Sequence, residues 1–414
     1  MAKAKRFFNS HRIFFGLFFS LLVYEILVGG HLSKWEVNEH FITFYTVDFG
    51  LGFCSRFLPG AVYRFLFRET SVATASLFSA ALLLLFFAGV CLLLEKLVKR
   101  APEEHRLPCL FCVGLFLTGP AGVSLFVRWL GVLDFYWVFA VLLFFIFLSH
   151  KRLYFLIPLP FALCCFVHYG AMVCYIPMMA ILLLYKAAVV PDRREKKYLL
   201  TAFAVGVALA IGTAGYFMLF EKQNLVYPVL EFNRILRSRG ANYTYYYDYD
   251  LYRVAVSEAG EVVSIDPQTD LPFFGRLLHA VRAQIDTTFG EGFKSGSMLE
   301  LSLAGLALAP VLAGCGFSVK ALLSVKEKKN GLRTFSLLLL LPLFLLTLTF
   351  GTFFSTDTFR WLTHLILPQL AALLYVSYYE GNVIFAEIKR RFAFVPPPAA
   401  AAYLVLFAAL APST

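Results

Sequence analysis

The segment VATASLFSAALLLLFFAGVCLLL, residues 72–94, decides the fold class of this chain. It is a continuous apolar run, longer than the ~20 residues that a helix needs to cross the hydrocarbon core of a bilayer. The charged sequence EKLVKR follows it directly at 95–100. Because only a helix satisfies its own backbone polar groups in lipid without a partner strand, this run predicts a membrane-spanning helix with a cytoplasmic end at Arg100.

Apolar runs of the same kind fill most of the 414 residues. The chain is 60% hydrophobic and only 15% charged, and its mean hydropathy is +0.73, which is unlike a soluble globular protein. We predict an all-α integral membrane protein, a polytopic bundle of about 10–11 transmembrane helices. The predicted spans lie near residues 13–28, 72–94, 107–127, 135–149, 153–189 (a hairpin of two), 198–220, 299–317, 335–354 and 362–379, and an eleventh at 394–410 begins with three prolines.

The net charge of +11 alone would suit a nucleic-acid-binding protein, but Lys and Arg lie mainly in short loops between the spans. That pattern is the positive-inside rule, so it predicts a cytoplasmic N-terminus and argues against nucleic acid as a partner. The expected location is a bacterial plasma membrane. We divide the chain into an N-terminal module of about seven spans at 1–220, with a first outer loop at 31–71, an extracytoplasmic loop at 221–297, and a C-terminal module at 298–414.

The first outer loop contains TVDFGLGFCSRFLPG, residues 46–60, where Asp48 precedes a Gly-Leu-Gly hinge. Arg56, Arg64 and Arg68 follow at multiples of four, which predicts that they share one face of an amphipathic helix lying in the membrane interface. A carboxylate in a flexible loop beside a basic helix suits a site for a lipid-linked phosphate. The alternative is a helix that only meets lipid headgroups.

The extracytoplasmic loop at 221–297 is the one long hydrophilic segment of the sequence, and we expect it to fold in part. Residues 225–239 have the period of an amphipathic helix, and residues 252–265 alternate as a β-hairpin does. Residues 273–285 predict another helix.

Further polar residues fall at the predicted outer ends of distant spans, namely Asp134, His168, Asp357 and Arg360. Each has an ordinary explanation by itself: Asp134 is placed to cap the following helix, and Asp357 with Arg360 form an i,i+3 pair. Together with Asp48 they predict a cleft at one rim, where carboxylates transfer protons and cations hold phosphate.

We predict no metal site from the cysteines. Cys109 and Cys112 form a single CxxC without a second pair or nearby histidines, and small apolar packing explains them better than zinc or redox chemistry.

With VDFGLGFCSRFLPG at 47–60, FVHYGAMVCYIP at 166–177 and TDTFRWL at 356–362, the chain resembles the polytopic, polyprenyl-phosphate-dependent glycosyltransferases of the GT-C type, including uncharacterised bacterial members. The resemblance implies transfer of a sugar from a polyprenyl-phosphate donor to a glycan, lipid or protein acceptor on the outer face, in cell-envelope polysaccharide or glycoconjugate assembly. It implies no organic cofactor and leaves room for a divalent cation. The first loop lacks the paired acidic motif of these enzymes.

The same resemblance suggests roles for individual residues. Asp48 looks like the first-loop catalytic carboxylate, which would act as general base, and Asp134 resembles the acidic residue that often follows the third span. The phosphate leaving group would need charge stabilisation, which Arg56, Arg64 or Arg360 would supply. His168 and Tyr169 would position a sugar or phosphate, with Asp357 nearby in the substrate site.

Two other classes remain open. An envelope polysaccharide polymerase or ligase would place its essential arginines and histidines mainly within 221–297. A multi-span transporter or flippase would usually show a repeat between its halves and broken helices near the midplane, and we find no such repeat in the sequence.

Overall fold

A computed structural model of the chain describes residues 7, 9–27, 36–118, 126–127, 129–220, 224–241, 252–256, 262–267, 331–339, 358–391, 393, 396, 398–399 and 401–403. The predicted span at 299–317, most of the spans at 335–354 and 394–410, and the predicted helix at 273–285 lie outside these residues.

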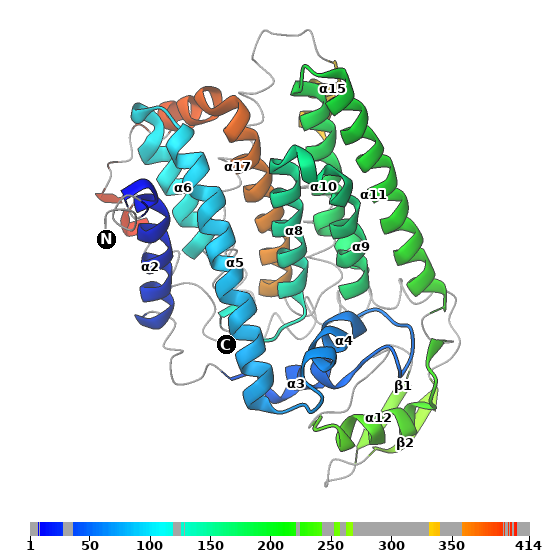
Figure 1. The fold of residues 1–414 in the computed structure, drawn as a ribbon. Coiled ribbons are helices and arrows are strands. Elements are labelled where there is room, and N and C mark those ends of the chain that lie inside the picture. The colour runs from blue at the N-terminus through cyan, green and yellow to red at the C-terminus, as the bar shows by residue number, and fades with distance from the viewer. Residues whose placement is uncertain are drawn as a thin grey trace, which may run out of the picture.

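The described residues form a helix bundle with a small polar domain at one end (Figure 1). Packed helices of the bundle include α5 (Val72–Arg100), α8 (Asp134–Ser149), α9 (Pro158–Val167), α10 (Ala171–Val189), α11 (Arg193–Phe220) and α17 (Thr358–Arg391). The α5 helix also contacts α2 (Arg12–Leu27) and α6 (Arg106–Thr118), while α15 (Gly331–Leu338) packs on α10.

Successive helices run in opposite directions, so polar residues from distant parts of the sequence reach the same end. The start of α8, the end of α9 and the start of α17 lie at the end of the bundle where α3 (Glu39–Thr46) and α4 (Phe57–Leu66) are found (Figure 1). Asp134 is the first residue of α8, and His168 directly follows α9. The opposite end holds the end of α5 and the beginning of α11, together with the connection between α8 and α9, which contains the short 3-10 helix η3 (Lys151–Leu156). We refer to these as the α3/α4 end and the basic end.

Length and apolar composition identify which helices could cross a membrane. Among the described residues, α5, α10 and α11 are long and apolar enough to cross a membrane. Three helical segments are apolar but shorter, namely α8, α9 and the part of α2 at residues 12–23. The 16 residues of α8 and the 10 of α9 fall below the ~20 of a full span. The structure thus confirms helices in these regions, and the turn at His168-Tyr169-Gly170 separates α9 from α10 as predicted.

The long α5 helix has clear local signals at both ends. Ser71 and Thr74 form a capping box, in which the Ser71 hydroxyl accepts the Thr74 N–H at 3.1 Å. Lys99 and Arg100 occupy the last turn, where cations favour the helix dipole. Inside the helix, Gly89 allows close packing on α8, because a Cβ there would lie 2.8 Å from a Leu142 methyl carbon.

The polar domain joins the first loop to the segment that follows α11. It contains α12 (Val229–Ser238) and an antiparallel hairpin of β1 (Tyr252–Val256) and β2 (Val262–Pro267), with a bulge at Ala255/Val256. The predicted hairpin is confirmed. The predicted helix at 225–239 is confirmed too, but it starts only after Pro228, because residue Leu225 pairs instead with Gly52 in a β-bridge.

That bridge requires the glycine. Gly52 has φ +152°, and a Cβ there would lie 2.7 Å from the Asn224 carbonyl oxygen. The Val226 N–H donates to the Leu51 carbonyl at 3.0 Å, and the Asn224 amide donates to the Phe53 carbonyl at 3.0 Å. A separate apolar core also joins the first loop and α4 to α12. It consists of the buried side chains of Val47, Leu51, Cys54, Phe57, Phe232, Leu236 and Ala241.

Candidate functional site

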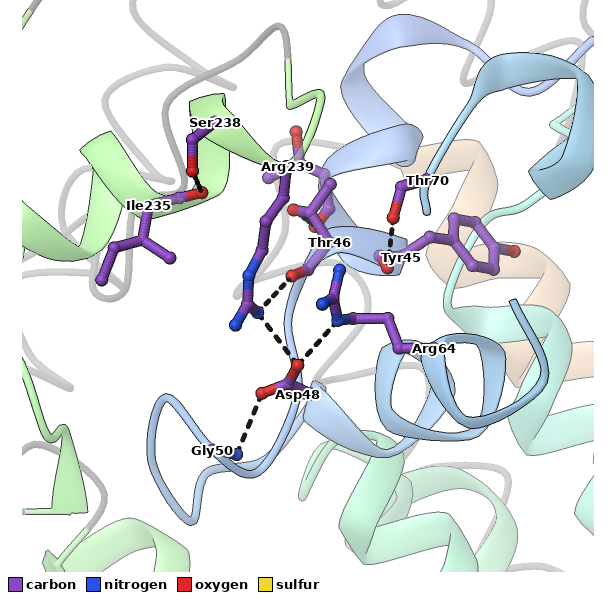
Figure 2. A network of polar contacts seen from close by, with 10 residues as sticks. Tyr45, Thr46, Asp48, Gly50, Arg64, Thr70, Ile235, Ser238 and Arg239 are labelled. Atoms are coloured by element: carbon purple, nitrogen blue, oxygen red, sulfur yellow. Dashed lines mark hydrogen bonds and ion pairs between the residues drawn. The ribbon is translucent and has the colours of Figure 1, made fainter. Parts of the chain in front are cut away.

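Asp48 lies at the centre of an ion-pair cluster at the α3/α4 end (Figure 2). Its Oδ2 accepts from Arg64 Nε at 2.7 Å and from Arg239 Nη1 at 3.0 Å, and its Oδ1 accepts the Gly50 N–H at 2.9 Å. The three charged side chains are each about one-fifth exposed, at 22% for Asp48, 21% for Arg64 and 22% for Arg239. The cluster is therefore neither buried nor freely solvated.

Local structure holds Arg239 in this position. The residue follows the last turn of α12, its N–H donates to the Ile235 carbonyl at 3.1 Å, and Gly240 then takes a left-handed φ of +95°. The guanidinium also donates to the Thr46 carbonyl at 3.0 Å (Figure 2). Burial lowers the pKa of the Arg239 guanidinium, and the nearby Asp48 carboxylate opposes that shift.

The cluster carries two guanidinium groups against one carboxylate, so it has a surplus positive charge. Among the described contacts, Arg64 uses only Nε and Arg239 only Nη1 as donors. Each guanidinium has five N–H donors in a planar fork, so donors remain for a further anion. The arrangement suits the recognition of a phosphate or carboxylate group beside the Asp48 side chain.

The prediction that Arg56, Arg64 and Arg68 share one helical face is wrong. The α4 helix begins at Phe57 and ends at Leu66, so only Arg64 lies within it. Arg56 precedes the helix with a left-handed φ of +69°, because its N–H bonds to the Phe166 carbonyl at 2.9 Å while the next side chain, Phe57, stacks on Phe232.

The exposed surface of α4 is nevertheless apolar. Phe65 is 87% exposed, Leu66 57% and Val62 46%, whereas Tyr63 on the opposite side is fully buried. Gly60 lets the helix lie directly on the loop, since a Cβ there would meet the Val47 carbonyl oxygen at 2.2 Å. An exposed apolar face with arginine beside it is what an interfacial helix presents to a membrane.

A second polar group forms where the first loop meets the turn between α9 and α10. Arg56 Nη2 lies 2.5 Å from His168 Nε2, and the Gly170 N–H donates to His168 Nδ1 at 2.9 Å. The Tyr169 ring stacks on the His168 ring with centroids 4.5 Å apart. The structure thus brings together three of the predicted site residues, Arg56, His168 and Tyr169.

A third group is buried between α8, α10 and α17. His364 Nε2 lies 2.8 Å from Asp134 Oδ2, and His364 Nδ1 lies 2.6 Å from the Tyr175 hydroxyl. Asp134 and His364 have almost no exposed surface. Trp137 connects this group to the second, because its indole N–H lies 3.2 Å from the His168 carbonyl and its ring centroid lies 5.1 Å from that of His364.

Asp48, His168 and Asp134, three members of the predicted rim constellation, therefore lie in three separate side-chain groups. Asp357 lies outside the described residues, and Arg360 lies in the first turn of α17 with its side chain outside them. Sequence reasoning missed Arg239, Tyr175 and His364. For His364 a signal existed, since it is an ionisable residue inside an apolar run, whereas nothing in the sequence marked Arg239 as the partner of Asp48.

Within the part of the chain that the structure describes, no group of three or more His, Cys, Asp or Glu side chains is arranged to hold a metal ion. Comparisons with protein-family models, with curated proteins and with solved structures find no match to this chain. The functional interpretation therefore rests on the geometry of the three groups.

Proposed function

We propose that this chain is an integral membrane glycosyltransferase that moves a sugar from a polyprenyl-phosphate donor to an acceptor on the extracytoplasmic face. The observation that supports this proposal is the Arg64–Asp48–Arg239 cluster, which combines a carboxyl group with surplus guanidinium donors. A sugar transfer from a lipid phosphate needs both, a proton acceptor and cations for the leaving group.

The position of the cluster fits a lipid-linked substrate. Arg64 belongs to α4, whose exposed side carries Val62, Phe65 and Leu66. If these side chains enter the membrane interface, Arg64 lies at the level of the lipid headgroups, where the phosphate of a polyprenyl lipid also lies. The basic end of the bundle would then face the cytoplasm, in accordance with the positive-inside rule.

In the proposed reaction the acceptor hydroxyl oxygen attacks the anomeric carbon of the sugar. The bond between that carbon and the phosphate oxygen breaks, and the hydroxyl proton moves to Asp48. The Arg64 and Arg239 guanidinium groups stabilise the charge on the departing polyprenyl phosphate. Both guanidinium groups already donate to Asp48 Oδ2, so they lie beside the carboxylate that would receive the proton.

The other groups would position the substrate. Arg56, His168 and Tyr169 offer a cation, an imidazole and an aromatic face for a sugar or phosphate. Arg360, in the first turn of α17, and Asp357, which precedes α17 in the sequence, would add a cation and a carboxylate. In this proposal Asp134 orients the His364 imidazole and does not contact the substrate itself, because the two side chains are paired and buried.

One observation favours a second candidate function, a proton-coupled transporter. Buried acid–histidine pairs inside helix bundles commonly serve as proton relays, and the Asp134–His364–Tyr175 group has this composition. In that case Asp134→Asn would abolish substrate uptake driven by a pH gradient, whereas a glycosyltransferase would show no such uptake.

Sugar transfer in reconstituted vesicles tests the first proposal, with a panel of radiolabelled polyprenyl-phosphate monosaccharides as donors and membrane glycolipids as acceptors. Asp48→Asn keeps an oxygen for the Gly50 N–H but removes the proton acceptor, so turnover should fall by roughly 10²- to 10⁴-fold. Arg68→Gln is the matched control, because Arg68 is exposed and lies outside the cluster. Asp48→Asn activity within about twofold of wild type, far above that range, would remove Asp48 as the base.

A further inference from the structure

An apolar cavity of about 190 Å³ lies between α5, α8 and α17, toward the basic end of the bundle. Its walls are aliphatic and aromatic side chains from all three helices, among them Val90, Leu94, Val141, Leu142, Ala371 and Leu374. Tyr175 and Pro368 also line the cavity, and Tyr175 is the residue bonded to His364. The cavity therefore extends inward as far as the buried Asp134–His364 group without exposing it.

The mouth of this cavity is cationic. Lys96 lines it, and the Arg100 guanidinium lies 4.3 Å from the ring centroid of Tyr378, another lining residue. Lys96 and Arg100 are four residues apart on α5 and thus share one face. Both are exposed, and neither has a carboxylate partner among the described residues.

A neighbouring cation on α5 behaves differently. Lys99 Nζ lies 3.0 Å from Glu95 Oε1, and it also donates to the Ser10 carbonyl at 2.5 Å. Lys99 is therefore neutralised by the protein's own carboxylate and serves the contact with the N-terminal segment. The two cations at the cavity mouth, in contrast, remain available for an external anion.

We infer that this cavity binds one hydrocarbon chain of an anionic lipid, whose phosphate is held by Lys96 and Arg100. The cavity exceeds the roughly 150 Å³ that suffices for benzene in an apolar protein cavity, so it holds a chain segment of about six to eight carbons. Tyr378 and Tyr379 at the mouth have the amphipathic rings that favour the headgroup region. The inference rests on the proposed membrane placement of the bundle, but not on sugar transfer.

The cavity lining includes Lys96 and Ser149, near the basic end, whereas Asp48 pairs with Arg64 of α4 at the α3/α4 end. The cavity would therefore take its lipid from the leaflet at the basic end. Each cation near an anionic membrane surface contributes about 1 kcal/mol of attraction, or about fivefold in occupancy. A zwitterionic lipid of the same chain length would lack most of that attraction. Selectivity for anionic over zwitterionic headgroups is therefore the property that identifies the site.

Photo-crosslinking of the full chain in phosphatidylcholine nanodiscs tests the inference. One probe is phosphatidylglycerol with a diazirine in one acyl chain, and the other is phosphatidylcholine with the same chain. Cross-linked peptides mapped by mass spectrometry should place the phosphatidylglycerol probe on the cavity-lining segments of α5, α8 and α17. Lys96→Gln or Arg100→Gln should each reduce that labelling about fivefold, and Lys99→Gln should leave it unchanged.

A cavity-filling variant separates the cavity from the outer surface. Ala371→Trp should abolish labelling of the lining segments, whereas Leu92→Trp, at an α5 position that is 42% exposed and outside the cavity, should not. If Ala371→Trp impairs folding, Leu374→Phe fills the space more gently. Equal labelling by both lipid probes, or labelling that survives cavity filling, would overturn the inference. Loss of sugar-transfer activity would leave it intact, because the readout is lipid binding.

Discussion

The His364 imidazole and the Asp134 carboxylate meet at 2.8 Å in the interior of the bundle, although 230 residues separate them in the sequence. This contact ties the first turn of α8 to α17, and the Tyr175 hydroxyl extends it to α10. Removing one member of such a buried pair destabilises the fold, because the remaining side chain then has neither water nor a hydrogen-bond partner.

The first prediction concerns that pair. Asp134→Asn or His364→Gln should each lower the free energy of unfolding by about 3–5 kcal/mol, as expected when one partner of a buried pair is removed. The double variant should lose less than the sum. Unfolding by sodium dodecyl sulfate in mixed micelles measures these differences. Glu104→Gln is the matched control, since Glu104 also faces a histidine, His105, but is 66% exposed, and additive losses would contradict the pairing.

The second prediction concerns Arg239, which only the structure connects to Asp48. If its guanidinium binds the donor phosphate, Arg239→Gln should remove a charge-assisted hydrogen bond of about 1.5–3 kcal/mol and reduce kcat/KM by roughly 10- to 150-fold. Steady-state transfer from a polyprenyl-phosphate sugar measures the effect. Arg237→Gln, two residues earlier and within the last turn of α12, should retain wild-type kinetics, and equal losses in both variants would point to a general effect on α12.

The third prediction tests the orientation of the bundle. Ser238→Cys at the α3/α4 end should react with an impermeant maleimide in intact cells, whereas Arg193→Cys at the start of α11 should react only after the membrane is broken. The described native cysteines whose side chains are placed are all buried, so they should contribute little labelling. The reverse pattern would place the Asp48 cluster in the cytoplasm and exclude the proposed outer-face reaction.

The fourth prediction concerns the exposed face of α4. A tryptophan introduced as Phe65→Trp, at a position 87% exposed, should be quenched by lipids brominated near the headgroup, beyond the quenching of the 4 native tryptophans. Ser238→Trp in the polar domain is the control and should add no quenching. Phe65→Trp emission that is insensitive to every brominated lipid would show that α4 faces water.

Much of the fold could be predicted because its signals are local. The run at 72–94 and the basic residues after it define α5, and alternation at 252–265 defines the β-hairpin. Such patterns reflect backbone hydrogen bonds and side-chain burial that involve residues close together in the sequence. One segment is therefore enough to predict them. The same holds for the turn at His168, where two apolar helices meet.

The candidate site was harder to predict than the helices, because its ion pairs form between segments that are far apart in the sequence. Asp48 was recognised from its glycine-rich loop, but Arg239 reaches it across 191 residues only because Leu51 and Phe232 share one small core. Helical periodicity alone placed Arg56 with Arg64, yet the bond from its N–H to the Phe166 carbonyl starts the helix one residue later. The sequence by itself determined the helices, the turns and the types of polar side chain present. Tertiary packing decided which charged side chains form pairs, because a contact between distant segments produces no periodic pattern in the sequence of either segment.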